Sequence, residues 1–417
     1  MTEYLVIASF LVAFAMIANW VSKTIVTAPM VFLGFGAILS WFDLVPLEGS
    51  EASLDIVAEI TLIVLLFLDA AQIDQRALLR RRVWPFRMLA FGLPLGFLFG
   101  LALGLVLLPG WPIAVIALVA AILVPTDAAL GQAVVTNTAI AERPRRALTV
   151  ESGLNDGLAL PLVLIMAALA APLSQAPPEG WAVFTVKQIV LGPLVGCVIG
   201  LIAGKILLWS KRTNATADIY EGVGAIALAA LTYLAAVNVG GNGFIAAFAG
   251  GLGFGAVVRG RCAFVYEFTE SEGQLLSWAA FFLLGAVLVP EAAAYLTWNT
   301  ALLILGSLFI VRPLAIWIAL LGTDAQPVTR LFFGWFGPRG LATALFALMV
   351  VDQLDTQIGE DVLFLAINTV WISAVLHGIT AVPGAAWYAR RLDRLGPDGA
   401  EHEASEPSAE AFHSRMT

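Results

Sequence analysis

The feature that most constrains this chain is a series of thirteen apolar stretches, each long enough to cross a lipid bilayer. A transmembrane helix needs about 20 predominantly apolar residues, because the hydrocarbon core of a bilayer is about 30 Å thick. Only 12% of the 417 residues are charged, against about 25% in soluble domains. We therefore predict an all-α, multi-pass membrane protein. The stretches lie near residues 3–20, 24–42, 54–70, 86–108, 111–136, 147–171, 184–208, 219–238, 241–258, 274–290, 297–321, 331–351 and 361–387.

Basic residues fall almost entirely in every second loop, and this asymmetry orients the chain. Because cytoplasmic loops are enriched in Lys and Arg, we expect an external N-terminus and a cytoplasmic C-terminus. We expect residues 1–392 to form the membrane domain and the polar residues 393–417 to form a disordered cytoplasmic tail. The basic loops contain Lys23, Arg143, Lys211, Arg259 and Arg330, and the acidic loops contain Asp43, Glu48, Glu179, Glu291 and Asp355.

Composition and motifs also exclude several classes of function. A net charge of −8 and the lack of a basic patch argue against nucleic-acid binding. The chain has no HExxH motif and no Ser/His constellation, so we expect neither an enzyme nor a bound cofactor. No Lys or Arg precedes the first apolar stretch, so we interpret it as a retained membrane helix rather than a signal peptide.

Five charged residues lie inside the apolar stretches, and they are the best candidates for a functional site. A charge at the centre of a bilayer costs about 2.5–3.5 kcal/mol on insertion scales, so five unpaired charges would cost about 15 kcal/mol. That cost rivals the whole stability of a typical domain, so these residues must pair or line a wet cavity. They are Asp127, Glu151, Asp156, Arg312 and Arg339.

The first candidate, Asp127, lies in the sequence PTDAALG, where we expect the fifth stretch to be broken. Pro125 removes a backbone donor within the stretch. A broken helix exposes N–H and C=O groups that can hold an ion or a charge. The alternative is that Asp127 only caps the second half of a kinked helix, and the two roles can coexist.

The second group lies in VESGLNDG, at residues 150–157 of the sixth stretch. Glu151 and Asn155 are four residues apart and share a helix face, with Ser152 and Asp156 in the same two turns. These side chains provide two carboxylates, one amide and one hydroxyl. The alternative for Glu151 is a position at the cytoplasmic interface beside Arg146.

Arg312 lies midway along the eleventh stretch, and Arg339 follows Gly337 and Pro338 in the twelfth, which we also expect to be broken. The alternative for each arginine is a fixed structural ion pair, since arginine stays protonated.

If the seventh stretch is a linker, stretches 1–6 and 8–13 form two sets of opposite orientation. The breaks then fall in the fifth stretch of each set, as in secondary transporters built from inverted repeats.

These motifs resemble those of the monovalent cation:proton antiporters, in the electroneutral branch that includes NhaP proteins and animal sodium/proton exchangers. The most specific motif is ESGLND at 151–156, whose Asn155-Asp156 pair is similar to the Asn-Asp signature of that branch. PTDAALG, LFLDAAQIDQRALLRRR, GNGFIAAFAGGLGFG, VRPLAI and GPRG support the resemblance, which extends over about residues 5–390. One departure is Ala128, where many members have proline.

The resemblance implies an NhaA-like antiporter fold: two inverted six-helix repeats, crossing broken helices and a homodimer. It implies core helices near 86–171 and 297–387, dimer-layer helices near 3–70 and 219–290, and a linker helix near 184–208. Asp156 and Asp127, with Thr126, Ser152 and Glu151, would bind the cation or proton. Asn155 would hold the oxygen cage, Arg312 would pair with Glu151, and Arg339 would offset charge at the second break.

The side chains themselves support cation:proton exchange. Carboxylate, amide and hydroxyl oxygens suit hard cations such as Na⁺, and a cation and a proton would compete for the same carboxylates. The five charges sum to −1, which favours one-for-one exchange. The alternatives are a K⁺/H⁺ antiporter, a transporter of the same fold for another solute, and, less favoured, an ion channel.

Overall fold

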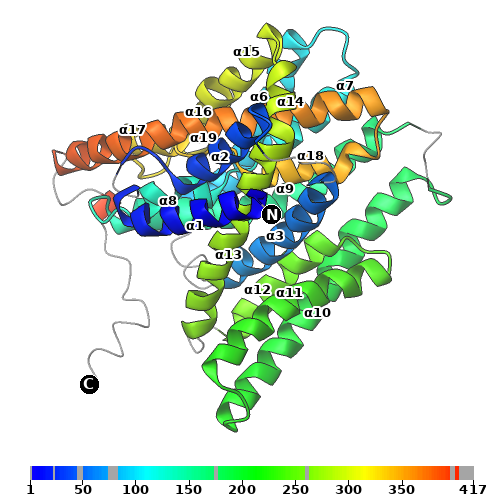
Figure 1. Cartoon of the computed structure of the whole chain (residues 1–417), viewed down its shortest axis with the longest axis vertical. Coiled ribbons are helices and arrows are strands. Elements are labelled where there is room, and N and C mark those ends of the chain that lie inside the picture. The colour runs from blue at the N-terminus through cyan, green and yellow to red at the C-terminus, as the bar shows by residue number, and fades with distance from the viewer. Residues whose placement is uncertain are drawn as a thin grey trace.

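The computed structural model describes residues 2–21, 24–44, 50–73, 83–172, 177–258, 263–394 and 400–402, and these residues form helices without a β-strand (Figure 1). The first half of the chain contains α1 (Thr2–Val21), α2 (Ala28–Trp41), α3 (Ser50–Gln72), α5 (Val83–Arg87), η1 (Met88–Gly92), α6 (Leu93–Leu107), α7 (Ile113–Ile122), α8 (Ala128–Val135), α9 (Glu142–Ala170) and α10 (Trp181–Arg212). The second half contains α11 (Asp218–Asn238), α12 (Gly243–Val258), α13 (Ala263–Leu283), η3 (Leu284–Leu288), α14 (Val289–Ala294), α15 (Trp298–Gly306), η4 (Ser307–Val311), α16 (Arg312–Ala319), α17 (Pro327–Trp335), α18 (Leu341–Val351), α19 (Thr356–Asp393) and η5 (Ala400–His402).

The predicted all-α membrane fold is confirmed. Among the described residues, seven helices are long and apolar enough to cross a membrane, and shorter apolar helices accompany them. Each predicted stretch coincides with a helical segment, and the fifth and twelfth are interrupted, between α7 and α8 and between α17 and α18. The closely spaced pair α11 and α12 is separated by a turn in which Gly240 adopts a φ of 80°, a conformation that favours glycine.

Three membrane segments contain a widened π-helical turn, and each turn ends two residues before a proline. The turns η1, η3 and η4 precede Pro94, Pro290 and Pro313. Proline lacks a backbone donor and its ring clashes with the carbonyl of residue i−4, so a wider turn lets the helix continue past it. In the eleventh segment the π turn is followed directly by Arg312, one of the five predicted charges.

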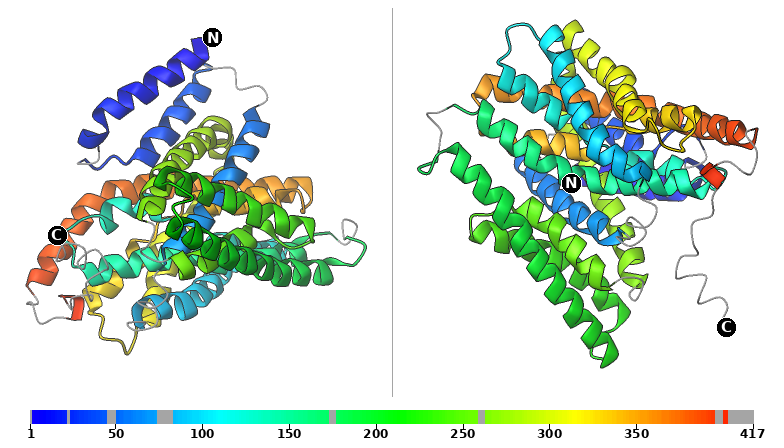
Figure 2. Two further views of the ribbon diagram at one scale, coloured as in Figure 1. Left: turned by 90° about the horizontal axis from the view of Figure 1, so that it is seen from below. Right: turned by 180° about the vertical axis from the view of Figure 1, so that it is seen from behind.

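The helices pack in two groups (Figures 1 and 2). Helices α3 and α10 to α13 pack mainly against one another, whereas α6 to α9 and α15 to α19 surround the two breaks. The long helix α10 lies against α12 because glycine removes the side chains between them. A methyl group on Gly196 would overlap the backbone of Ala246, and one on Gly200 would overlap Gly250. Small residues allow this close approach of membrane helices.

Contacts between loops support the predicted alternation of the two membrane faces. At the end predicted to be cytoplasmic, Trp84 donates a hydrogen bond to Asp324, at 2.7 Å, and Arg143 forms an ion pair with Asp324, at 2.7 Å. At the opposite end, the rings of Tyr295 and Phe364 stack, with centroids 4.9 Å apart. These contacts join segments that the charge pattern assigns to the same face.

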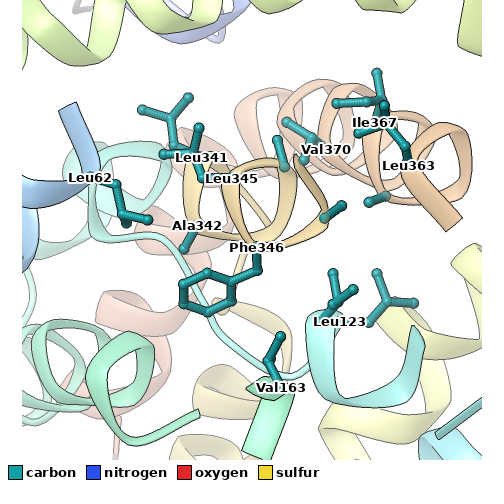
Figure 3. Close-up of a cluster of buried hydrophobic side chains, with 14 of the residues drawn as sticks. Leu62, Leu123, Val163, Leu341, Ala342, Leu345, Phe346, Leu363, Ile367 and Val370 are labelled. Atoms are coloured by element: carbon teal, nitrogen blue, oxygen red, sulfur yellow. The ribbon is translucent and has the colours of Figure 1, made fainter. Parts of the chain in front are cut away.

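An apolar cluster covers one side of the breaks (Figure 3). Phe346 of α18 is fully buried and points to the side of Val163 of α9 and Leu123, at the end of α7, while Val370 of α19 and Leu62 of α3 belong to the same cluster. The half-helices α7 and α18 both lie between the breaks and the face predicted to be external. The packing therefore closes that side with hydrocarbon.

The beginning of the predicted tail differs from the prediction of disorder at residues 400–402, which form the short helix η5. The Glu401 side chain is buried and accepts hydrogen bonds from the Gln326 amide, at 2.9 Å, and from the Thr329 hydroxyl, at 2.8 Å. Glu401 therefore caps the start of α17. Residues 403–417, like Lys23, Glu48 and Arg259, lie outside the described residues.

Candidate functional site

The first break places the Asp127 carboxylate between two helix N-termini. Its Oδ2 accepts a hydrogen bond from the Leu341 amide at the start of α18, at 2.8 Å, and its Oδ1 accepts one from Leu130 in α8, at 3.4 Å. Negative charge at a helix N-terminus is favourable, because the first amide groups have no partner within the helix. Asp127 thus caps both half-helices, and the capping alternative is part of the structure.

The second break places the Arg339 guanidinium against the end of α7. Its Nη1 donates hydrogen bonds to the carbonyl oxygens of Val124 and Pro125, the latter at 2.9 Å. The Arg339 side chain is 2% exposed, so these carbonyls replace water as its partners. The two breaks are also joined by a backbone hydrogen bond, since the Asp127 amide donates to the Pro338 carbonyl at 2.8 Å.

The two glycines of GPRG are required by this crossing. A methyl group on Gly340 would overlap the Asp127 carboxylate, and one on Gly337 would overlap the Arg312 guanidinium. Each broken helix therefore supplies a charge to the other, and the two glycines of the second break leave space for Asp127 of the first break and for Arg312 of α16. The two breaks form one unit.

Glu151 and Arg312 form a buried, bidentate ion pair beside the breaks. Arg312 Nη1 lies 3.0 Å from Glu151 Oε1, and Nη2 lies 3.1 Å from Oε2. Nη2 also donates to the Phe333 carbonyl, at 3.4 Å. Glu151 is 3% exposed, so it does not lie at a membrane interface beside Arg146. The structure brings together the pair that the resemblance implied.

Asn155, Thr126 and Ser152 connect this ion pair to the first break. The Asn155 amide donates a hydrogen bond to the Thr126 hydroxyl. The Thr126 oxygen lies 3.4 Å from both Glu151 Oε2 and the Ser152 hydroxyl. All four side chains are buried, so helix α9 is fastened to the residue that precedes Asp127.

Asp156 has the least satisfied carboxylate of the site. Its Oδ1 is buried and has no hydrogen-bond partner among the described residues. The carboxylates of Asp127, Asp69 and Glu151 all lie within electrostatic range of it. A buried acceptor without a donor is costly, so this oxygen is suited to receive a proton or a cation.

Asp69 is a site residue that the sequence reasoning missed. It lies near the end of α3 and faces Gly153, one helical turn before Asp156 on α9. The motif LFLDAAQIDQRALLRRR contains it, but its position close to the basic loop suggested the end of a span. With Asp69 the charged set sums to −2, so the earlier count of −1 no longer selects one-for-one exchange.

The described residues contain no group of three or more His, Cys, Asp or Glu side chains able to hold a metal ion. The oxygens that gather at the breaks are instead of mixed type. Carboxylates come from Asp127, Asp156 and Asp69, and hydroxyls come from Thr126 and Ser152.

Two interrupted helices that cross inside the membrane, with carboxylates between their ends, define a secondary transporter rather than an enzyme. The comparisons with known proteins narrow this class. A sequence profile described as sodium/hydrogen exchanger, transmembrane, matches residues 7–387. The chain belongs to the sodium/hydrogen exchanger family.

Several characterised relatives are similar to parts of this chain. The K⁺/H⁺ antiporter NhaP of Alkalimonas amylolytica is 28% identical over 290 residues, which cover 67% of this chain and 48% of that protein. The K⁺/H⁺ antiporter NhaP2 of Shewanella oneidensis is 27% identical over 272 residues, covering 64% and 46%. The Na⁺/H⁺ antiporter 2 of Zygosaccharomyces rouxii is 26% identical over 349 residues, covering 78% and 42%. This chain thus spans about half the length of these relatives.

The fold is also that of a solved antiporter. The sodium proton antiporter MjNhaP1 from Methanocaldococcus jannaschii at pH 8 superimposes with a TM-score of 0.76 and 22% sequence identity. The match covers 94% of this chain and 99% of that structure. It confirms the predicted antiporter fold.

Proposed function

We propose that this protein is an antiporter that exchanges a monovalent cation, most favourably Na⁺, for H⁺ by alternating access. The proposal uses no cofactor and agrees with the relatives, which are named Na⁺/H⁺ and K⁺/H⁺ antiporters. The observation that carries it is the buried Asp156 Oδ1, which has no hydrogen-bond partner in the described part of the chain and lies within electrostatic range of the carboxylates of Asp127 and Asp69. Like charges this close disfavour joint ionisation, so the site is stabilised by either a proton or a cation.

The contacts divide the proposed roles among the site residues. Asp156 and Asp127 bind the exchanged ions, and Asp69 extends this set. Thr126 and Ser152 contribute hydroxyl oxygens, while the Asn155 amide holds Thr126 in place.

The remaining charges have supporting roles in the proposal. Glu151 already gives both carboxylate oxygens to Arg312, so the pair acts as fixed support and not as a cation ligand. Arg339 neutralises the carbonyl end of α7. One-for-one, electroneutral exchange now rests on the resemblance of Asn155-Asp156 to the electroneutral signature.

We further propose a homodimer in the cell membrane, with an external N-terminus and a cytoplasmic C-terminus. Helices α3 and α11 to α13 pack with one another and with the linker helix α10, and this separate packing supports the assignment of α3 and α11 to α13 to the dimer layer beside a mobile core of α5 to α9 and α15 to α19. The positive-inside pattern supports the orientation.

The decisive experiment measures cation-driven proton flux in proteoliposomes with a pH-sensitive dye, using Na⁺, Li⁺ and K⁺. Asp156→Asn should abolish flux with every cation, because the amide cannot exchange a proton. Asp352→Asn, the same substitution at an exposed position, is the matched control and should behave as wild type. Full flux in Asp156→Asn would refute the proposal.

The second candidate is K⁺/H⁺ exchange, which is favoured by the names of the two bacterial relatives. Na⁺ and K⁺ accept the same oxygen ligands, so ligand type does not separate them. Flux with K⁺ but not with Na⁺ in the same assay would select this candidate.

A further inference from the structure

The second break is attached to helix α19 by a chain of hydrogen bonds that the proposed ion exchange does not use. The Arg339 amide, just after the break, donates to the Ser373 hydroxyl at 2.7 Å. His377 lies one turn further along α19, with Nδ1 3.1 Å from the Ser373 hydroxyl. Its Nε2 lies 2.9 Å from the Trp335 carbonyl, just before the break.

Both ring nitrogens of His377 lie close to carbonyl oxygens. Nε2 is 2.9 Å from the Trp335 carbonyl, and Nδ1 is 2.9 Å from the Ser373 backbone carbonyl. A carbonyl oxygen only accepts, so a neutral ring donates to one of the two. With the hydrogen on Nε2, the ring donates to Trp335, and Nδ1 accepts from the Ser373 hydroxyl, whose oxygen accepts from the Arg339 amide. This tautomer joins the two sides of the break through Ser373 and His377.

Packing holds the imidazole in this position. His377 and Ser373 are 2% and 0% exposed, and the imidazole stacks on the Trp335 ring with centroids 4.8 Å apart. The Trp335 indole in turn donates to the Thr380 hydroxyl, at 3.0 Å. Both sides of the interruption at 336–340 are thus fixed to two adjacent turns of one continuous helix.

We infer that His377 is a positioning residue for the second break, acting through its neutral Nε2–H tautomer and Ser373. The inference rests on the proposed function only where it concerns ion binding. The segment that it holds carries Arg339 and leads to the Leu341 amide, which bonds Asp127. A loosened segment would displace Asp127 and weaken cation binding, although His377 touches no candidate ion ligand.

Two variants remove links of this chain, and two controls keep it. His377→Ala and Ser373→Ala each break it. His377→Gln keeps an amide donor for Trp335 and an oxygen acceptor for Ser373. Thr369→Val removes a buried hydroxyl from the same helix, but among the described residues that hydroxyl bonds only the Leu365 carbonyl, within the helix.

The first measurement is hydrogen exchange of the peptide spanning 336–341 in the purified, full-length protein. We expect His377→Ala and Ser373→Ala each to speed exchange by about tenfold, the effect of losing a typical hydrogen bond. The double variant should be little worse than either single one, because both remove the same chain. His377→Gln and Thr369→Val should match wild type.

The second measurement is the apparent KM for the cation. It should rise in His377→Ala and Ser373→Ala and be restored in His377→Gln, whereas a merely structural loss would lower only the amount of active protein. Equal defects in His377→Gln and His377→Ala, or in Thr369→Val and Ser373→Ala, would overturn the inference. Hydrogen exchange tests the chain of hydrogen bonds even if the protein transports nothing. Absence of flux in the wild type would therefore refute only the proposed function.

Discussion

At the scale of the residue, the site depends on two glycines, which have no side chain, as much as on its charged side chains. Gly337 and Gly340 leave the space into which the Arg312 guanidinium and the Asp127 carboxylate enter. The buried pair of Arg312 and Glu151 is favourable only while both partners are in place, since a lone charge in this position has no water. Glycine at these positions is therefore a condition for the charges beside them.

Gly337→Ala should displace Arg312 from Glu151 and destabilise the protein by about 3–5 kcal/mol, the cost of breaking a buried ion pair. The measurement is the thermal midpoint in detergent, together with exchange activity in proteoliposomes. Gly224→Ala is the matched control, because a methyl group there meets no atom within 4 Å. Equal midpoints for the two variants would show that Arg312 does not need this space.

At the scale of the element, each broken helix is completed by the other. Asp127, from the first break, bonds the first amide of α18, and Arg339, from the second, bonds carbonyls at the end of α7. Helix ends inside a membrane need such partners, since lipid offers none. The group formed by α3 and α10 to α13 is held differently, because glycines along α10 let that helix approach the backbone of α12.

Gly200→Leu should push α10 away from α12 and lower the thermal midpoint, since the added side chain would overlap Gly250. The loss should amount to about 1–3 kcal/mol or more, the usual cost of overpacking. Gly224→Leu places the same side chain on an exposed helix face and should leave the midpoint unchanged. A stable Gly200→Leu variant would contradict the packing of these two helices.

At the scale of the whole molecule, the two sets of six spans show a reciprocal arrangement. In the fourth span of the first set, η1 precedes Pro94, and in the fourth span of the second set, η4 precedes Pro313. Helix α16 packs on η1, while α6 packs on η4. Each fourth span thus packs on the π turn of the other. This reciprocal packing supports an inverted repeat, which the sequence indicated only by the order and orientation of the spans.

The proposed orientation predicts which loops a membrane-impermeant thiol reagent can reach in intact cells. With Cys197 and Cys262 replaced by serine, Ala294→Cys should react, because it follows the tenth span on the external face. Ala215→Cys should react only after the membrane is permeabilised. Both positions are exposed in the structure, so burial does not explain a difference. The reverse pattern would invert the topology.

The spans and both breaks could be predicted because apolar length and proline position are local properties of the sequence. The ion pair of Glu151 and Arg312 was implied by resemblance. Asp69 was missed because a carboxylate near the end of a span looks like an interfacial residue until α3 is packed against Gly153. The partners that Asp127 and Arg339 find on the other broken helix could not be predicted, since they are backbone groups more than 200 residues away along the chain.

The reciprocal capping of the two breaks has a consequence for ancestry. A single six-helix unit inserted alone would leave the carbonyl end of one half-helix and the amide end of the other without partners in lipid. A second copy inserted in the opposite orientation would supply both, as Arg339 and Asp127 now do within one chain. A precursor made of one repeat would thus have needed to insert in both orientations, and fusion of the two copies would have made that pairing permanent.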